Sequence, residues 1–163
     1  MTRVVVLDFE TYPYNGKSFL MEIGCVEIID GQIADSFQTL IRPVDKVSDF
    51  VLNLTGINER QLSDAPLFPN VIEQFHNFVK NSVVIAHNAP LDRMSYESLC
   101  DYYSIPPAFF QWVDSQDILK ILVPTCRSLQ LQVLIWFPHL SSDPSCKLKV
   151  SITTKTPNTK NGK

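Results

Sequence analysis

Two carboxylates stand two residues apart at the end of an apolar run near the N-terminus, in the stretch VVVLDFET. Side chains alternate along a strand, so Asp8 and Glu10 share one face if this stretch is extended. Carboxylates are rarely buried unless they are paired or bind a metal, and hard divalent cations such as Mg²⁺ prefer oxygen ligands of this kind. Unless both side chains merely end the strand in solvent, the pair predicts one part of a metal site.

A second polar group follows another short apolar run. VVIA at residues 83–86 leads directly into HNAPLD at residues 87–92, which predicts a strand, a turn and the start of a helix. Asp92 then falls in the first helical turn, and it faces the first carboxylate pair if the two strands lie side by side. Ligands of open α/β sheets gather at such strand ends. Taken alone, Asp92 is better explained by the helix N-terminal dipole, and His87 by an ordinary, partly buried histidine.

The elements that position these residues begin with three strands. Apolar and β-branched residues predict a strand over residues 3–9 and a second over residues 19–29. Asp30–Gly31 is a strong signal for a tight hairpin, and the chain returns as a third strand over residues 32–42. The N-terminal part is therefore predicted to be an antiparallel meander.

Helices dominate the middle of the chain. Short helices are predicted over residues 47–54 and 58–63, separated at Gly56, and Pro69 is placed to begin a longer one. That longer helix carries an apolar stripe at helical spacing, made by Val71, Ile72, Phe75, Phe78 and Val79.

Strands and helices then alternate. After the strand at 83–86, the sequence predicts a helix over residues 91–103, a short strand at Trp112–Val113 and a helix capped by Ser115. A last short helix is predicted over residues 127–136. This order predicts an α/β fold, a mixed sheet with helices packed on it.

Length and composition indicate one globular domain. The chain has 163 residues, no apolar run near the roughly 18 residues of a membrane span, and an N-terminus without the layout of a secretory signal. Its cysteines, Cys25, Cys100, Cys126 and Cys146, are scattered and form no C-x-x-C pair. This pattern is typical of reduced thiols, so we expect a cytoplasmic protein with no membrane segment.

Charge is unevenly distributed along the chain. Residues 147–163 hold five lysines and no acidic residue, whereas residues 1–146 hold the other nine basic residues and all 17 acidic ones, a net charge of −8. The body of the chain therefore lacks a strongly basic nucleic-acid footprint. The lysine-containing stretch could contact phosphates, although a solvated, disordered tail explains it better.

Together and in this order, the motifs resemble the DnaQ-like 3′–5′ exonucleases of the DEDD class, in particular the epsilon-type proofreading exonuclease of bacterial DNA polymerase III. The resemblance rests on VVVLDFET, MEIGCVEI with its DG hairpin, LTGINERQLSDAP, VVIAHNAPLD, WVDSQDILKILVP and SLQLQVL, and it covers residues 3–134. It implies the ribonuclease H-like fold for an exonuclease domain over residues 3–136, followed by an irregular or disordered tail over residues 137–163.

The resemblance also implies catalytic residues and cofactors. Asp8, Glu10 and Asp92 would be the catalytic carboxylates and would hold two Mg²⁺ or Mn²⁺ ions. One ion would help to generate hydroxide, and the other would stabilise the leaving 3′ oxygen.

A substrate and a partner are implied in the same way. The substrate would be the 3′ end of a single-stranded nucleic acid, with DNA favoured over RNA. The main chain near Phe9 and Thr11 would contact the terminal nucleotide, and His87 and Asn88 would shape its pocket. A DNA polymerase subunit is the protein partner implied.

The family's third motif, a helix with a general-base histidine and a metal-binding aspartate spaced His-x-x-x-x-Asp, has no clear counterpart here. His139 and Asp143 have the spacing His-x-x-x-Asp and lie between Pro138 and Pro144, in a stretch that cannot form a regular helix. We therefore expect these two residues to be coincidental rather than catalytic. The abrupt change of sequence character favours a C-terminus that is truncated, divergent or read in a shifted frame.

Three functions are compatible with this sequence. The first is a metal-dependent 3′–5′ exonuclease on DNA, of the proofreading or repair type. The second is a catalytically impaired remnant that binds nucleic acid or a polymerase partner, and the third is a 3′–5′ exoribonuclease. A nuclease assay with Mg²⁺ on single-stranded DNA and RNA separates them.

Overall fold

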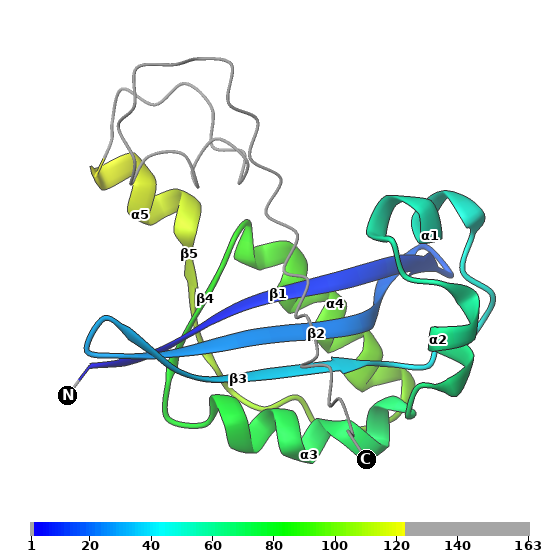
Figure 1. The fold of residues 1–163 in the computed structure, drawn as a ribbon, viewed down its shortest axis with the longest axis horizontal. Helices are drawn as coiled ribbons and strands as arrows, with labels where there is room; N and C mark the ends of the chain where they lie inside the picture. The colour runs from blue at the N-terminus through cyan, green and yellow to red at the C-terminus, as the bar shows by residue number, and fades with distance from the viewer. Residues whose placement is uncertain (1, 123–163) are drawn as a thin grey trace, which may run out of the picture.

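A computed structural model describes residues 2–122, in which five strands form one sheet in the order β3-β2-β1-β4-β5 (Figure 1). The strands are β1 (Arg3–Tyr14), β2 (Lys17–Ile29), β3 (Gln32–Leu40), β4 (Val83–Ala86) and β5 (Gln111–Asp114). The helices are α1 (Asp49–Thr55), α2 (Glu59–Asp64), α3 (Phe68–Val79), α4 (Ala89–Tyr102) and α5 (Ser115–Leu122). The predicted mixed sheet with flanking helices is confirmed.

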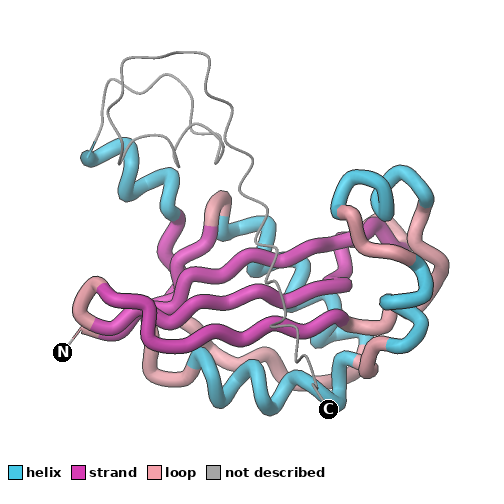
Figure 2. Tube along the Cα trace, viewed as in Figure 1, coloured by secondary structure: helices cyan, strands magenta, loops and turns pink. Residues whose placement is uncertain are grey.

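The first three strands form the predicted antiparallel meander, and Figure 2 shows them running side by side. The predicted hairpin at Asp30–Gly31 is confirmed, with positive φ angles of 49° and 82°. A second tight turn at Asn15–Gly16, with φ angles of 48° and 73°, joins β1 to β2. Positive φ at both central residues is the conformation that suits a two-residue hairpin.

The prediction that the first strand ends at residue 9 is wrong. β1 continues to Tyr14, because the Asn15–Gly16 turn lets it pair with β2 along its whole length. Asp8 and Glu10 therefore lie inside a long strand rather than at its tip.

β1 is also the neighbour of β4, in parallel orientation. The register pairs Val4 with Val83 and Val6 with Ile85, and the pairing goes no further along β1. Beyond Val6, β1 thus runs past the carboxyl end of β4. That is the sheet edge at which ligands of α/β proteins bind.

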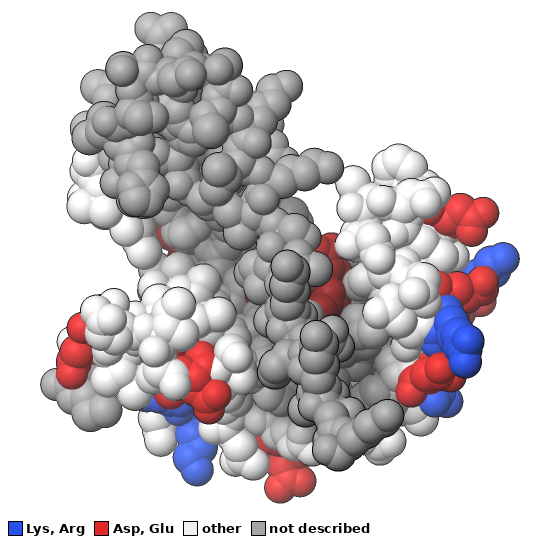
Figure 3. Space-filling view, in the orientation of Figure 1, with Lys and Arg blue, Asp and Glu red and all other residues white. Residues whose placement is uncertain are grey.

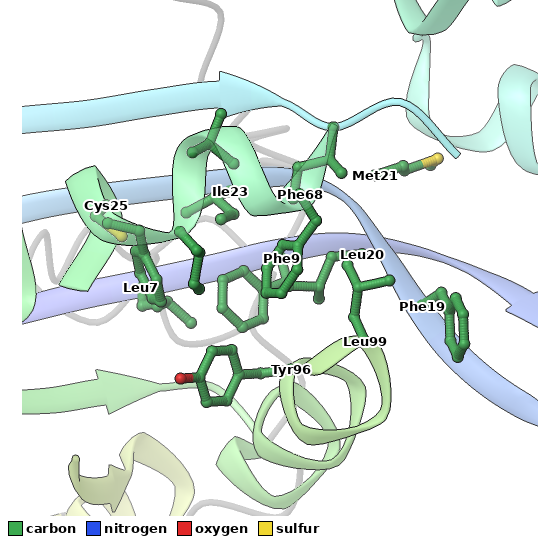
Figure 4. Packing of buried hydrophobic residues seen from close by; sticks show 14 of the residues in the cluster. Leu7, Phe9, Phe19, Leu20, Met21, Ile23, Cys25, Phe68, Tyr96 and Leu99 are labelled. Atoms are coloured by element: carbon green, nitrogen blue, oxygen red, sulfur yellow. The ribbon is translucent and has the colours of Figure 1, made fainter. Parts of the chain in front are cut away.

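Both long helices cover the same face of the sheet. The ring of Phe75 on α3 lies 5.9 Å from the ring of Phe9 on β1, 6.3 Å from Phe37 on β3 and 6.1 Å from Tyr96 on α4. Figure 4 shows side chains of β1, β2, α3 and α4 meeting in this core. Most of the predicted stripe on α3 is buried there, and only Phe78 is partly exposed.

Local signals explain where the helices begin and end. α1 ends at Gly56, whose φ of 77° is the left-handed conformation common after helices. α2 begins with a capping box in which the side chains of Asn58 and Gln61 each accept a backbone N–H from the other residue. α3 has Pro69 in its first turn, as predicted. Helices α1 and α2 lie at one end of the long strands (Figure 1).

The C-terminal elements differ in detail from the prediction. α4 begins at Ala89, two residues before the predicted start. The predicted cap of α5 is wrong, because Oδ1 of Asp114, and not Ser115, accepts the N–H of Gln116 at 2.8 Å. The helix predicted over residues 127–136 and the tail predicted over 137–163 lie outside the described residues.

Two further predictions concern thiols and membranes. Cys25 and Cys100 are buried free thiols, whereas Cys126 and Cys146 lie outside the described residues. Within residues 2–122, no helix is both long and apolar enough to cross a membrane.

Candidate active site

A cleft of about 1040 Å³ opens where β1 runs past the end of β4. Its walls are β1, the β1–β2 turn, the β4–α4 turn, one face of α4 and the start of α5. The lining residues include six of those predicted from the sequence, namely Asp8, Phe9, Thr11, His87, Asn88 and Asp92, whereas Glu10 stands beside the cleft without lining it.

Asp8 and Glu10 project from the same face of β1. Burial alternates along this strand, with Val5, Leu7 and Phe9 in the core, so the intervening residues point to the other side. Glu10 stands directly opposite Glu22 on β2, and the register of the two strands shifts between Glu10 and Thr11. This bulge is a local change of twist of the kind found beside active sites.

Asp92 approaches the same pair from the first turn of α4. The backbone N–H of Phe9 donates a hydrogen bond to the Asp92 carboxylate, which ties the start of α4 to β1. A carboxylate in this turn is also favoured by the helix dipole. β1 and β4 are therefore neighbours, which was the condition for the predicted grouping of Asp92 with Asp8 and Glu10.

The three carboxylates interact electrostatically. Burial, together with the negative charges of Asp8 and Glu22, raises the pKa of Glu10 to about 7. Burial and the charge of Asp8 raise the pKa of Asp92 to about 7, although the Phe9 N–H opposes this. Burial also raises the pKa of Asp8, and the neighbouring His87 lowers it. Negative charge in this cleft is thus costly unless a cation compensates it.

The donor chemistry fits a hard divalent cation, because the cleft gathers carboxylate oxygens whose charges disfavour one another. The carboxylate side chains are not positioned to coordinate one metal ion together. Among residues 2–122, no three His, Cys, Asp or Glu side chains are close enough to hold one metal ion together. Joint coordination by Asp8, Glu10 and Asp92 therefore requires side-chain rotations.

The turn from β4 into α4 is held by residues at the end of β5. Nδ1 of His87 lies 2.9 Å from Oγ of Ser115, and Nε2 of His87 lies 3.4 Å from Nε2 of Gln116. If the Gln116 amide donates to Nε2, then Nδ1 carries the proton and donates to Ser115. Asn88 adopts a left-handed conformation with φ of 62°, and its N–H donates to Oδ1 of Asp114 at 3.0 Å.

The side chain and the backbone of Phe9 face different parts of the protein. Its side chain is buried in the core, whereas its backbone lies along the cleft, so any contact with a nucleotide must come from the main chain. The predicted residues His139 and Asp143 lie outside the described residues.

Sequence reasoning missed Glu22, Asp114 and Gln116. The Asn15–Gly16 hairpin signal could have set the β1–β2 register and placed Glu22 opposite Glu10. Nothing local in the sequence marks Asp114 or Gln116, because their partners lie 26 and 29 residues away along the chain.

Comparison with known families identifies the class of protein. The chain belongs to the RNase T exonuclease family, whose model, described as Exonuclease, matches residues 5–131. The predicted resemblance to DEDD exonucleases is confirmed at this level. The match contains Asp8, Glu10 and Asp92 and ends before His139 and Asp143.

Similar proteins include larger bacterial enzymes. The PolC-type DNA polymerase III of Caldanaerobacter subterraneus subsp. tengcongensis is 42% identical over 89 residues, which are 54% of this chain and 6% of that protein. The 3′–5′ exonuclease DinG of Staphylococcus aureus is 30% identical over 136 residues, 82% of this chain and 15% of that protein. This chain therefore spans only a small part of either relative.

Solved structures share the fold. The nuclease domain of 3′hExo, a DEDDh family member bound to rAMP, has a TM-score of 0.72 at 21% identity, over 81% of this chain and 76% of that one. Exonuclease X in complex with 5′ overhanging duplex DNA has a TM-score of 0.64 at 23% identity, over 88% of this chain and 78% of that one. The predicted ribonuclease H-like fold is confirmed.

Proposed function

We propose that this chain is a divalent-metal-dependent 3′–5′ exonuclease that removes nucleotides from the 3′ end of single-stranded DNA. The observation that carries the proposal is the convergence of Asp8 and Asp92 in one cleft, with Glu10 beside Asp8 on β1: burial raises the pKa of all three carboxyl groups, and the charge of Asp8 raises those of Glu10 and Asp92 further. Groups with strongly shifted pKa values in a cleft are candidates for catalysis. Because the chain belongs to an exonuclease family, we expect this chemistry to be cleavage of a nucleic acid strand.

Each carboxylate has a role in this proposal. Asp8, Glu10 and Asp92 hold Mg²⁺ or Mn²⁺, with Asp8 placed between the other two in the network of charges. Two bound ions supply a lowered pKa for the attacking water and charge stabilisation for the leaving 3′ oxygen. Because β1 and α4 both belong to the packed core, the carboxylates are held on rigid elements.

Neighbouring residues position the substrate. The main chain at Phe9 and Thr11 contacts the terminal nucleotide. His87 and Asn88 form the adjoining wall of the cleft, in a conformation fixed by Ser115 and Asp114. Because both nitrogens of His87 face hydrogen-bonding groups, we assign His87 to shaping this wall rather than to proton transfer.

The distribution of charge limits how the strand binds. The formal net charge of the chain is −3, and Figure 3 shows acidic and basic side chains interspersed on the face in view rather than gathered in one basic area. An acidic cleft repels phosphate, so nucleic acid and divalent ions are expected to bind together. Removing the metal should therefore remove most of the affinity for the strand.

DNA is favoured over RNA, and a polymerase partner is proposed, because similar proteins are named PolC-type DNA polymerase III and DinG 3′–5′ exonuclease. An exoribonuclease is the second candidate. It is supported by the likeness to a nuclease domain that was solved with rAMP.

The decisive experiment is a cleavage assay with matched DNA and RNA strands labelled at the 5′ end. Stepwise shortening from the 3′ end in Mg²⁺ or Mn²⁺, lost in Asp8→Asn and kept in the control Asp35→Asn, supports the proposal. Asp35 is a suitable control because it is exposed on β3, away from the cleft. Faster shortening of RNA replaces the first candidate by the second, and binding without cleavage supports the impaired remnant.

A further inference from the structure

The cleft extends well beyond the three carboxylates. Its lining continues along β1 to Gly16, Lys17 and Ser18 at the β1–β2 turn, and along α4 to Ser98. Asp8 and the end of β1 at Tyr14 are separated by six residues, about 20 Å of extended strand. A mononucleotide at the carboxylate end leaves the far end of this cleft unfilled.

One face of α4 forms a wall of this cleft. Leu91, Met94, Ser95 and Ser98 recur at helical spacing and all line it. Leu91 and Met94 are 58% and 62% exposed and lie about one helical turn apart on this wall. Exposed apolar groups beside a polar cleft suit the faces of unpaired bases, which need apolar contacts once they are unstacked.

Acidic and basic residues line opposite ends of the cleft. Asp8 and Asp92 stand at one end, and within residues 2–122 Lys17 is the one lysine or arginine that lines this cleft. Phosphates of a strand that extends from the carboxylates along the cleft would therefore meet Lys17 at its far end.

Lys17 stands on a fixed hairpin and makes an exposed ion pair. It follows the two-residue turn at Asn15–Gly16, and the hairpin is fixed to α4 by an aromatic cluster in which the ring of Phe19 lies 5.1 Å from Tyr14 and 5.5 Å from Tyr102. Nζ of Lys17 lies 3.6 Å from Oδ2 of Asp101, and the two side chains are 55% and 69% exposed. Exposed ion pairs of this kind contribute little to stability, so a phosphate can replace Asp101 at small cost.

We propose that Lys17 binds a backbone phosphate of the substrate strand upstream of the scissile bond. The α4 wall at Leu91 and Met94 contacts the bases that lie between this phosphate and the scissile bond. This inference rests on the proposed function of the carboxylate end. It makes the enzyme one that selects single strands several nucleotides long over the shortest substrates.

The test compares strand length and salt dependence in the whole chain. The wild type should bind a single-stranded hexanucleotide more tightly than a dinucleotide, with Ca²⁺ replacing Mg²⁺ so that cleavage does not interfere. Lys17→Gln should remove most of this advantage and weaken hexanucleotide binding by about threefold. It should also reduce the slope of log K against log salt by about 0.7, the value for one phosphate contact of a single strand. Lys17→Arg should restore both.

Lys80→Gln is the matched control, because Lys80 is another exposed lysine that does not line the cleft. Equal length advantage and equal salt slope in Lys17→Gln and Lys80→Gln would overturn the proposal. That result would leave the exonuclease proposal intact if the wild type still shortens DNA in Mg²⁺. If the wild type neither binds the oligonucleotides nor shortens DNA in Mg²⁺, both proposals fail.

Discussion

Oδ1 of Asp114 accepts the backbone N–H of Asn88 at 3.0 Å, so the end of β5 fixes the turn that begins α4. The same oxygen accepts the N–H of Gln116 at 2.8 Å and thereby caps α5. One side chain thus positions two helices. Because α4 carries Asp92 and α5 carries Gln116, Asp114 also sets the shape of the cleft without lining it.

Asp114→Ala should destabilise the fold, because it removes an acceptor shared by two backbone N–H groups. Hydrogen bonds to charged groups contribute about 1.5–3 kcal/mol each, and we expect a loss of about 2 kcal/mol in the free energy of unfolding, measured with urea. The control is Asp117→Ala, since Asp117 is exposed and pairs with Lys120 on the same helix. Equal effects of the two substitutions would show that Asp114 holds nothing together.

Divalent metal should stabilise the protein through the carboxylate cluster. We expect Mn²⁺ to raise the melting temperature of the wild type, with a gain in stability of about 2.7 kcal/mol when the free ion is at roughly 100 times its Kd. Asp8→Asn should lose most of this gain, because Asp8 is coupled to both Glu10 and Asp92. A thermal shift titration measures it.

Asp35→Asn, on exposed β3, should keep the full metal response. A response of the same size in Asp8→Asn would place the metal elsewhere on the chain. The comparison needs no cleavage activity, so it tests the metal site even if the enzyme turns over slowly.

The sequence predicted most elements because local signals agreed with one another. Asp30–Gly31 marked the β2–β3 turn, Pro69 marked the start of α3, and the apolar run over residues 83–86 marked β4. The same reasoning underused Asn15–Gly16, an equally strong hairpin signal, and so ended β1 too early.

The carboxylates could be grouped from the sequence only on the condition that β1 and β4 are neighbours. The contacts that shape the cleft could not be predicted, because they join residues far apart in the chain. Glu22 reaches Glu10 through strand register, and Asp114 reaches Asn88 across two parallel strand ends. Such pairings depend on topology and not on local propensity.

Stability should also depend on His76, which lies outside the cleft. Nε2 of His76 is 2.8 Å from the hydroxyl of Tyr96, which also accepts the N–H of Ala108 at 2.8 Å and lies beside the thiol of Cys100. Burial lowers the pKa of His76, so the folded protein favours the neutral ring. The unfolded chain then binds more protons at this residue, and the contribution of His76 to stability should fall as pH drops through the ordinary histidine pKa of about 6.5.

His76→Gln removes this titration while keeping a polar side chain at the same place. The expected result is that the wild type loses unfolding free energy relative to His76→Gln between about pH 7.5 and pH 5. Urea unfolding at the two pH values measures it. An unchanged difference would mean that the acid sensitivity of this protein comes from other groups.

The last prediction compares Asp8, in the first sequence motif, with His139 and Asp143, which lie near the C-terminal end of the sequence. Asp8→Ala should abolish cleavage, because Asp8 lies in the cleft and is coupled to both other carboxylates. His139→Ala and Asp143→Asn should change residual cleavage by less than about threefold, which is roughly 0.6 kcal/mol in activation free energy. We predict this small effect because the spacing His-x-x-x-Asp and the prolines at 138 and 144 differ from what a helical third motif needs. Loss of a general base typically costs about 10²- to 10⁴-fold in rate, so a chain without that base should turn over slowly. Single-turnover cleavage of one labelled DNA strand by the three variants measures these effects together. A hundredfold loss in His139→Ala, from a fast wild type, would assign the general base to His139 and refute our interpretation of the C-terminal stretch.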